Sequence, residues 1–328
     1  MTLSTAEQAD VPDRDDGLVY VMPDDLQLAV EVALAAGRPL LLRGKPGSGK
    51  SSMAPFVAEQ RKWRYYNFVV TSQTRARDLQ WTYDGVARLA DAQASRSWRN
   101  RRLPGPDAYV EPGPLWWAFA PESARRHVSQ SAQVRGLQMD KHPMEERNEG
   151  RDPGHSVVLI DEIDKADPDV PNGLLVPLGT HGFTVAESGT AVAIEPSQGT
   201  VSDRPFHQHL VVITTNEERE LPQAFLRRCV IAELTPPSSV EQLVEIASTH
   251  LTARLGTVQD SDMRLAEALA HELRRVRQDA RKNNVREPST AEYLDALWAC
   301  RALNLTVGEG RWDAVCRLTL VKPQHFRR

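Results

Sequence analysis

Short apolar runs alternate along this chain with segments of helical periodicity. Four of the runs are continuous and bounded by polar residues, which predicts buried strands. They lie at residues 39–42, 65–70, 155–160 and 210–215. Buried strands of this kind that alternate with helices predict an α/β fold, in which helices cover both faces of a parallel sheet.

Five segments have the periodicity of amphipathic helices. They span residues 24–36, 51–60, 240–255, 262–283 and 290–304. Gly37 is the expected stop of the first. Ser238 is the expected N-cap of the third, and Glu241 would complete a capping box with it. The chain beyond residue 236 therefore predicts a small, all-helical domain.

A long segment, residues 71–154, separates the second and third predicted strands. It contains a basic cluster at 96–102 and a Gly/Pro-rich region at 104–114, after which a helix is expected near Leu115. Residues 121–154 are charge-rich and have few apolar side chains. Because long loops inside a compact domain are usually functional or mobile, we expect parts of this segment to be poorly ordered.

The predicted elements divide the chain into three parts. Residues 1–18 are rich in Asp and Pro and predict a disordered tail. Residues 19–235 hold the predicted strands, including a hairpin expected at 183–194, and predict an α/β nucleotide-binding domain with a long insert. Residues 236–328 predict the helical domain.

Composition narrows the class of protein. The 328 residues carry a net charge of −4, which does not indicate a general coat for nucleic acid. Cys229, Cys300 and Cys316 are far apart, so neither a disulfide framework nor a zinc knuckle is expected. The N-terminus is polar, unlike a signal peptide, and no apolar run approaches the roughly 20 residues of a membrane span. We therefore expect a cytoplasmic protein.

A glycine-rich segment follows the first predicted strand and matches the phosphate-loop pattern G-x-x-x-x-G-K-[ST]. Its residues are Gly44, Lys45, Pro46, Gly47, Ser48, Gly49, Lys50, Ser51 and Ser52. The glycines let backbone N–H groups turn toward an anion, and the helix that follows directs its positive end there. Lys50 is the expected ligand of the β- and γ-phosphates, and the Ser51 hydroxyl the expected ligand of Mg²⁺.

Two carboxylates, Asp161 and Glu162, follow the third predicted strand. Ligands bind at the carboxyl end of the strands in open α/β sheets, so both are expected at the site. Asp161 is the candidate Mg²⁺ ligand, and Glu162 the candidate general base for an attacking water. An acidic turn after a buried strand is common by itself; the phosphate loop upstream favours the catalytic interpretation.

Two further segments hold candidate catalytic side chains. Asn216 ends the fourth predicted strand and could hydrogen-bond the attacking water or the γ-phosphate. Arg227 and Arg228 precede another apolar segment, and a guanidinium offered to the γ-phosphate of a neighbouring subunit would neutralise charge in the transition state. Taken alone, the arginines would indicate a surface salt bridge.

These four segments, in this order, resemble the AAA+ ATPases over about residues 20–305. Within that family the chain is most similar to the MoxR branch. The similarity lies in the segments at 111–117, at 172–178 followed by 182–185, and at 221–229. The last resembles the family's L-P-x-A-x-L-D-R-F, which puts Arg228 at the finger position and Arg227 where the family often has Asp.

The resemblance implies an AAA+ P-loop core followed by a helical lid, with ATP and Mg²⁺ as cofactors. It implies a homo-oligomeric ring, expected to be a hexamer, because in this architecture a finger at Arg228 cannot reach the phosphate of its own subunit. It also implies chaperone-like remodelling of a protein partner, often one with a von Willebrand A domain.

Two parts of the family's nucleotide site are less clearly matched. The second sensor is an Arg in the third lid helix, but no Arg follows Pro288 and Ser289 here, so Arg286 is the candidate substitute. Tyr20 and Val21, just before the first helix, are candidates for the adenine pocket.

Two other functions stay open at this point. The basic cluster at 96–102, with Trp98 inside it, could bind nucleic acid by charge and stacking in a DNA- or RNA-remodelling motor, although a protein contact or a solvated face is favoured. The missing second-sensor Arg would fit a slow, ATP-dependent switch, although Glu162 argues for hydrolysis.

Overall fold

The structure is a computed structural model that describes residues 17–97, 103–137, 142–194, 209–308 and 310–321. The chain divides into two compact units. The first, here called the loop–lid unit, comprises residues Met1–Pro23, Gly44–Phe56 and Glu233–Arg328. The second, the sheet unit, comprises Asp24–Arg43 and Val57–Ala232. The basic cluster expected at 96–102 lies almost wholly outside the described residues, as does most of the predicted tail.

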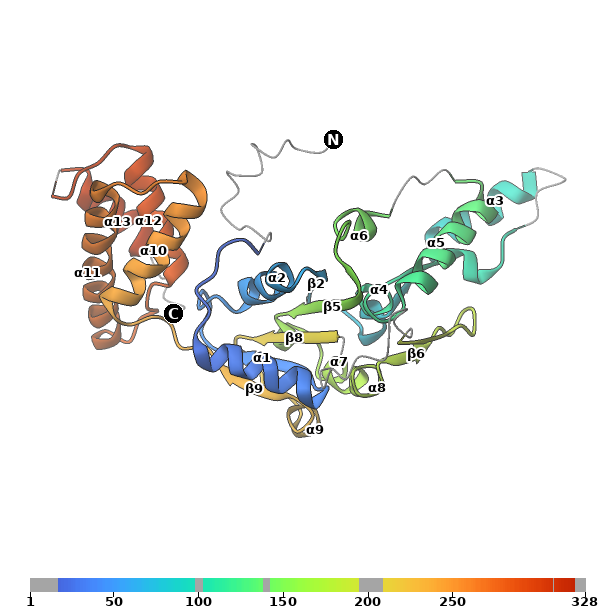
Figure 1. Cartoon of the computed structure of the whole chain (residues 1–328). Coiled ribbons are helices and arrows are strands. Elements are labelled where there is room, and N and C mark those ends of the chain that lie inside the picture. Colours follow the sequence, from blue (N-terminus) through green and yellow to red (C-terminus); the bar gives the residue numbers. More distant parts are fainter. Residues whose placement is uncertain (1–16, 98–102, 138–141, 195–208, 309, 322–328) are drawn as a thin grey trace. The chain divides into compact units, whose positions relative to one another are not determined.

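The sheet unit is built on a five-stranded sheet with the order β2-β5-β8-β1-β9 (Figure 1). The strands span β1 Leu40–Arg43, β2 Trp63–Val69, β5 Asp152–Asp161, β8 His209–Thr215 and β9 Val230–Glu233. The pairings of β2 with β5, of β5 with β8 and of β8 with β1 are parallel. The predicted parallel α/β fold is therefore confirmed, and its four predicted strands are β1, β2, β5 and β8.

The three central strands are buried on both faces, because alternate side chains of each strand point to opposite sides of the sheet. Val158 and Ile160 of β5 belong to one core cluster, together with Leu41 of β1. Their neighbours Val157 and Leu159, on the opposite face, are also buried. This two-sided burial explains why the strands read as continuous apolar runs in the sequence.

Helices pack against this sheet. Helix α1 (Asp24–Ala36) contacts β1 and β8, and helix α4 (Pro114–Phe119) contacts β2 and β5. Helix α2 (Lys50–Arg61) begins in the phosphate loop. All six residues of α4 are buried, including both tryptophans of the segment Pro114-Leu115-Trp116-Trp117. A fully apolar helix needs cover on every side. Three further elements also contact α4: α5 (Pro121–Arg135), β4 (Val110–Pro112) and β7 (Ala191–Ala193).

The insert between β2 and β5 contains more regular structure than its composition predicted. Its elements are β3 Trp81–Tyr83, α3 Gly85–Ser97, β4 Val110–Pro112, α4, α5 Pro121–Arg135 and α6 Pro143–Glu146. Strands β3 and β4 pair in an antiparallel sheet of their own. Helix α5 is polar and buries only Ala124 and Ala132, so apolar periodicity gave no signal for it.

A second small sheet follows β5. After helices α7 (Asp169–Gly173) and α8 (Leu175–Thr180), strands β6 (Gly182–Thr184) and β7 (Ala191–Ala193) form an antiparallel hairpin. This confirms the hairpin expected at 183–194. Helix α9 (Gln223–Leu226) then precedes the edge strand β9.

The described part of the lid contains four helices around a core of its own. They are α10 Val240–Leu255, α11 Asp260–Lys282, α12 Thr290–Ala302 and α13 Trp312–Leu320. Leu243, Leu269 and Leu297 are among the fully buried side chains of that core. The first three helices match those predicted, and α13 was not predicted.

The predicted cap of α10 is wrong by one residue. Ser239, not Ser238, is the N-cap, and its Oγ accepts a hydrogen bond from the Gln242 N–H. Gln242 completes the capping box in the role expected of Glu241. Adjacent serines gave the same sequence signal, and only the backbone conformation distinguishes them, since Ser239 is extended.

Candidate functional site

The phosphate loop has the backbone conformation that its glycines allow. Gly44, Gly47 and Gly49 have φ angles of 146°, 73° and 89°, a region that other L-residues rarely adopt. A Cβ added at Gly44 would lie 2.4 Å from the carbonyl oxygen of Leu234, and one at Gly49 would lie 3.1 Å from the Tyr20 ring. The loop therefore requires glycine both for its curvature and for its close neighbours.

Two polar side chains of the loop indicate an anion site. Lys50, the first residue of α2, is buried, and its Nζ donates to the carbonyl oxygens of Gly44 (2.6 Å) and Lys45 (3.0 Å). The buried Oγ of Ser48 has no hydrogen-bond partner among the described residues. A fixed ammonium, an unsatisfied hydroxyl and the N-terminus of α2 together fit a bound phosphate. Ser51 and Ser52 are exposed on the first turn of α2.

Tyr20 packs against this loop. Its ring lies beside Gly49 and is tilted against Phe56, with a centroid separation of 5.6 Å. Burial raises the pKa of the Tyr20 hydroxyl. The neighbouring Val21 is half-buried. The structure thus places Tyr20 at the loop, and its role in an adenine pocket stays a prediction.

Asp161 and Glu162 lie at the carboxyl end of β5 and share one hydroxyl from the next strand. Thr214 Oγ1, on β8, donates to Asp161 Oδ1 at 2.5 Å and accepts from the Glu162 N–H at 2.8 Å. Thr214 is fully buried. Thr214 was not predicted, because a threonine inside an apolar strand carries no signal until the neighbouring strand is known.

The Glu162 carboxylate is fixed by two side chains. Asn216 Nδ2 donates to its Oε1 at 3.2 Å, and Lys165 Nζ pairs with its Oε2 at 2.5 Å. The backbone of Glu162 is left-handed, with φ 60° and ψ 49°. A non-glycine residue in this region costs on the order of 1–3 kcal/mol, and such strain concentrates at functional sites. The structure therefore brings two predicted catalytic residues, Glu162 and Asn216, into direct contact.

Asp164 holds the Asn216 backbone in place. It is 2% exposed, and its carboxylate accepts from the N–H groups of Asn216 (3.2 Å) and Glu218 (2.9 Å). A buried carboxylate needs such donors, and these two fix the turn after β8. The signal was present in the sequence, since Asp164 closes the run Asp161-Glu162-Ile163-Asp164.

The two candidate finger arginines lie on the exposed turn between α9 and β9. Arg228 Nη1 donates to the Ala224 carbonyl at 3.3 Å, and the carbonyl of Arg227 accepts from Arg38 Nη1 at 2.7 Å. Both arginines are exposed. This turn precedes β9, which lies at one end of the strand order.

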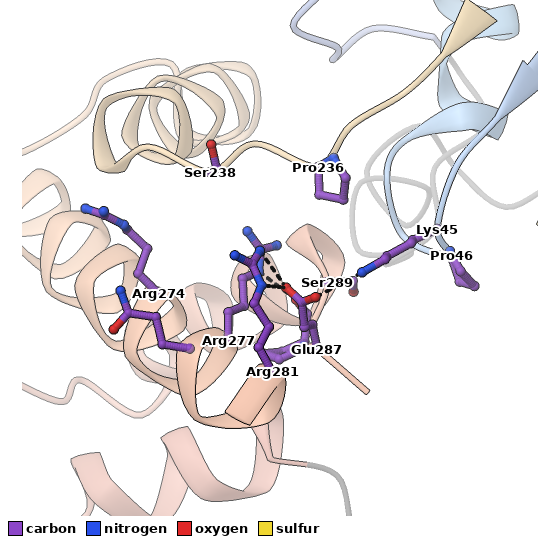
Figure 2. Close-up of a pocket in the computed structure, with 11 residues that line it drawn as sticks. Lys45, Pro46, Pro236, Ser238, Arg274, Arg277, Arg281, Glu287 and Ser289 are labelled. Atoms are coloured by element: carbon purple, nitrogen blue, oxygen red, sulfur yellow. Dashed lines mark hydrogen bonds and ion pairs between the residues drawn. The ribbon is translucent and has the colours of Figure 1, made fainter. Parts of the chain in front are cut away.

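Within the loop–lid unit, the lid contacts the phosphate loop directly. A Cβ added at Gly47 would lie 2.4 Å from the Cβ of Ser289, the N-cap of α12. Lys45 Nζ pairs with Glu287 Oε1 at 2.9 Å (Figure 2). Arg286, the candidate second sensor, instead pairs with Glu292 at 2.9 Å.

The sequence from residue 39 to residue 229 matches the AAA domain of the dynein-related subfamily. The match covers more than half of the chain. The chain belongs to the AAA domain family. Its phosphate loop, paired carboxylates and Asn216 all lie within the matched residues, so nucleotide binding and ATPase activity are the properties that the family implies. No curated protein sequence matches the chain.

Solved structures of similar fold are distant in sequence. A putative ATPase from Cytophaga hutchinsonii is 15% identical, with a TM-score of 0.41, over 93% of this chain and 83% of that protein. The Holliday junction branch migration motor RuvB of Thermotoga maritima is 15% identical, with a TM-score of 0.42, over 90% of this AAA chain and 67% of RuvB.

No group of three or more His, Cys, Asp or Glu side chains that could hold a metal occurs among the described residues. Ser51 and Asp161 stay predictions as ligands of Mg²⁺, an ion that typically combines one or two such oxygen ligands with substrate phosphates and water. No helix in the described part of the chain is long and apolar enough to cross a membrane.

Proposed function

We propose that this AAA protein is a Mg²⁺-dependent ATPase in which Glu162 is the general base. The observation that carries the proposal is the fixed carboxylate of Glu162, held by Asn216 and by Lys165 at the carboxyl end of β5. A general base must be positioned as well as basic, and the hydrogen bond from Asn216 provides that positioning, whereas the Lys165 ammonium restrains the carboxylate.

The remaining residues bind and orient the substrate. Lys50 and the backbone of Gly47 and Gly49 would hold the phosphates, while Ser51 and Asp161 would hold Mg²⁺. When bound, Mg²⁺ neutralises charge on the phosphate oxygens. In the structure Lys50 bonds to loop carbonyls, so phosphate oxygens would replace those carbonyls as its partners.

Asn216 has two tasks in this proposal. Its backbone N–H donates to Asp164, which fixes the turn that carries the side chain. Its Nδ2 donates to Glu162, and its Oδ1 would orient the attacking water. Removing Asn216 would therefore lower kcat, because neither the Glu162 carboxylate nor the attacking water would be held in position.

We further propose that the protein works as a MoxR-like homo-oligomeric ring, with Arg228 as the finger for a neighbouring subunit. The exposure of Arg228 on the turn before the edge strand supports this role. The ring would use hydrolysis for chaperone-like remodelling of a protein partner, as the MoxR branch does, with a von Willebrand A domain as the first partner to try. Nucleic acid is not the proposed substrate, and the proposed compartment is the cytoplasm.

Steady-state ATP hydrolysis tests the catalytic assignments. Lys50→Ala and Glu162→Gln should each lower kcat by about 10²-fold or more, and Arg228→Ala by about 10³-fold, while Glu220→Gln, an exposed control, should not. Glu162→Gln should still bind ATP. A Glu162→Gln protein that hydrolyses like wild type would overturn the assignment, and activity lost only with Arg227→Ala would move the finger to that residue.

A slow ATP-dependent switch is the second candidate function, and the ion pair between Lys165 and Glu162 favours it. A base held by an ammonium is less available to water. Single-turnover rates of ATP hydrolysis, measured with and without the partner protein, separate the two functions. The rate of a motor should rise when the partner is added. A switch should bind the partner with no change in that rate. A pull-down with Glu162→Gln, which should hold ATP and retain the partner, supplies the protein for that assay.

A further inference from the structure

The backbone turns sharply at Glu162, where the chain leaves the sheet. Ile160, before it, is fully buried in β5, and Ile163, after it, is fully buried at the start of the 3-10 helix η4 (Ile163–Lys165). Glu162 lies between these two anchors in the left-handed conformation. A strained residue of this kind persists only where its surroundings hold it, so the contacts of its backbone decide whether the proposed base stays in position.

The backbone pairing of β5 with β8 ends just before this turn. Ile160 lies opposite Ile213, and this is the last pair in the described register of the two strands. Thr214 follows Ile213, and its Oγ1 continues the connection: it accepts from the Glu162 N–H at 2.8 Å and donates to Asp161 Oδ1 at 2.5 Å. A side chain thus replaces the backbone as the link between β8 and the turn that carries the base.

Thr214 is held firmly from the other side of β8. Its backbone is in register with Leu42 of β1, and its side chain is fully buried. Because a β-branched side chain is restricted at χ1, a buried threonine in a central strand keeps its hydroxyl in one place. The hydroxyl is therefore a fixed point to which a neighbouring turn can be attached.

A hydroxyl meets two opposite demands at this position. The Glu162 N–H needs an acceptor, whereas the Asp161 carboxylate needs a donor. Since Asp161 takes the proton of the Thr214 hydroxyl, the lone pairs of that oxygen are left for the Glu162 N–H. Serine would keep this arrangement, and valine would keep the shape of threonine without it.

We propose that Thr214 is a positioning residue for ATP hydrolysis: its hydroxyl, oriented by Asp161, holds the left-handed backbone of Glu162. The inference rests on the proposed ATPase function. Asn216 bonds to the carboxylate of Glu162 and Thr214 to its backbone, so the two contacts are separate. Asp161 is also in register with Val69 of β2, so loss of the hydroxyl should displace Glu162 more than Asp161.

Steady-state ATP hydrolysis by Thr214→Val and Thr214→Ser tests the proposal. In Thr214→Val, kcat should fall about tenfold or more, because one hydrogen bond that positions the base is lost, while the KM for ATP should stay within about threefold of wild type. Thr214→Ser should keep kcat within about threefold. A serine variant as slow as the valine variant would assign the effect to the lost methyl group and would overturn the proposal.

Thr215→Val is the matched control. Thr215 is the next residue of β8 and is also buried, but its Oγ1 accepts from the Glu217 N–H at 3.0 Å and not from Glu162. This variant also loses a hydroxyl within the strand, and its kcat should stay within about threefold of wild type. An equal fall in kcat for Thr215→Val and Thr214→Val would mean that the strand as a whole is disturbed, and the positioning role would be wrong.

A double-mutant cycle separates positioning from a general loss of structure. If Thr214 acts through Glu162, Thr214→Val should lower the single-turnover rate of ATP hydrolysis about tenfold or more in the wild-type background. In the Glu162→Gln background it should lower that rate by less than about threefold, because the base is already absent. Equal factors in the two backgrounds would contradict the proposal.

Hydrogen exchange of the Glu162 amide, followed by NMR in the nucleotide-free full chain, gives a readout that does not depend on activity. The amide should be protected in wild type and should exchange about tenfold faster or more in Thr214→Val. The Val70 amide, which donates to the Asp161 carbonyl at 2.9 Å, should exchange equally in both. An unprotected Glu162 amide in wild type would overturn the proposal, and this measurement requires no variant to fold.

The outcomes for the two proposals are distinguishable. If wild type hydrolyses no ATP, the ATPase proposal fails, and the positioning role fails with it. If wild type hydrolyses ATP and a folded Thr214→Val protein keeps kcat within about threefold, only the positioning role of Thr214 fails.

Discussion

At the scale of single residues, Lys165 restrains the proposed base. Its side chain is 42% exposed and pairs with Glu162, three residues earlier. A partly exposed ion pair is worth roughly 0.2–1 kcal/mol. Because Glu162 must leave this pair to accept a proton from water, Lys165→Met should raise kcat by up to about fivefold. Steady-state ATP hydrolysis at saturating ATP measures the effect.

Lys62→Met is the matched control for that change. Lys62 pairs with Glu59, again three residues earlier, at the end of α2 rather than beside the proposed base. Its replacement should leave kcat unchanged. A fall in kcat with Lys165→Met would show that the ammonium assists the reaction, and the restraint would then be the wrong interpretation.

His142 links the stability of the insert to pH. Its Nδ1 accepts from the Met144 N–H as the N-cap of α6, and its ring stacks on Trp117 with a centroid separation of 4.8 Å. Burial lowers its pKa, although Glu145 and Glu111 oppose the shift. The unfolded chain therefore binds more protons than the folded chain, and stability should fall as pH drops below about 6.5.

The measurement is the Tm between pH 7.5 and pH 5.5. The Tm of His142→Gln should fall less than that of wild type over that interval, because the variant lacks one group that takes up a proton on unfolding. His127, whose pKa burial also lowers, should contribute in the same direction and serves as a second variant. An unchanged pH dependence in both variants would contradict the assignment.

At the scale of elements, the N-cap of α10 differs by one residue between the prediction from sequence, Ser238, and the structure, Ser239. Ser239 Oγ accepts from the Gln242 N–H, whereas Ser238 is bonded only through its backbone N–H in the described contacts. Ser239→Ala should therefore lower the free energy of unfolding by about 1 kcal/mol, and Ser238→Ala by a few tenths at most. Urea denaturation of both variants measures the difference. The reverse order would restore the cap predicted from the sequence.

The elements also show where prediction from sequence succeeds. The strands were predictable because burial on both faces makes residues 157–160 of β5 and 210–213 of β8 continuously apolar. Asp161, Glu162 and Asn216 were predictable because each follows such a strand. Thr214 was not, since its role depends on a partner 53 residues away: its hydroxyl joins β8 to Asp161 of β5.

At the scale of the whole molecule, the proposed ring makes a prediction that no single subunit can test. Arg228→Ala subunits keep the phosphate loop and Glu162 but lack the finger. Glu162→Gln subunits lack the base but keep Arg228. Each pure protein should be nearly inactive. In mixed rings, an Arg228→Ala subunit whose neighbour supplies Arg228 regains a complete site, so random mixing at equal amounts should restore activity at about a quarter of the interfaces.

The mixing experiment is read as ATP hydrolysis against the fraction of each variant, with native mass spectrometry of the same samples to count subunits. A maximum at intermediate fractions requires that Arg228 act on a neighbour, because a finger acting within its own subunit would give only the weighted mean of two inactive proteins. Arg227→Ala mixed with Glu162→Gln is the control. If that mixture shows the maximum and the Arg228→Ala mixture does not, the finger is Arg227, which the exposed turn before β9 would also allow.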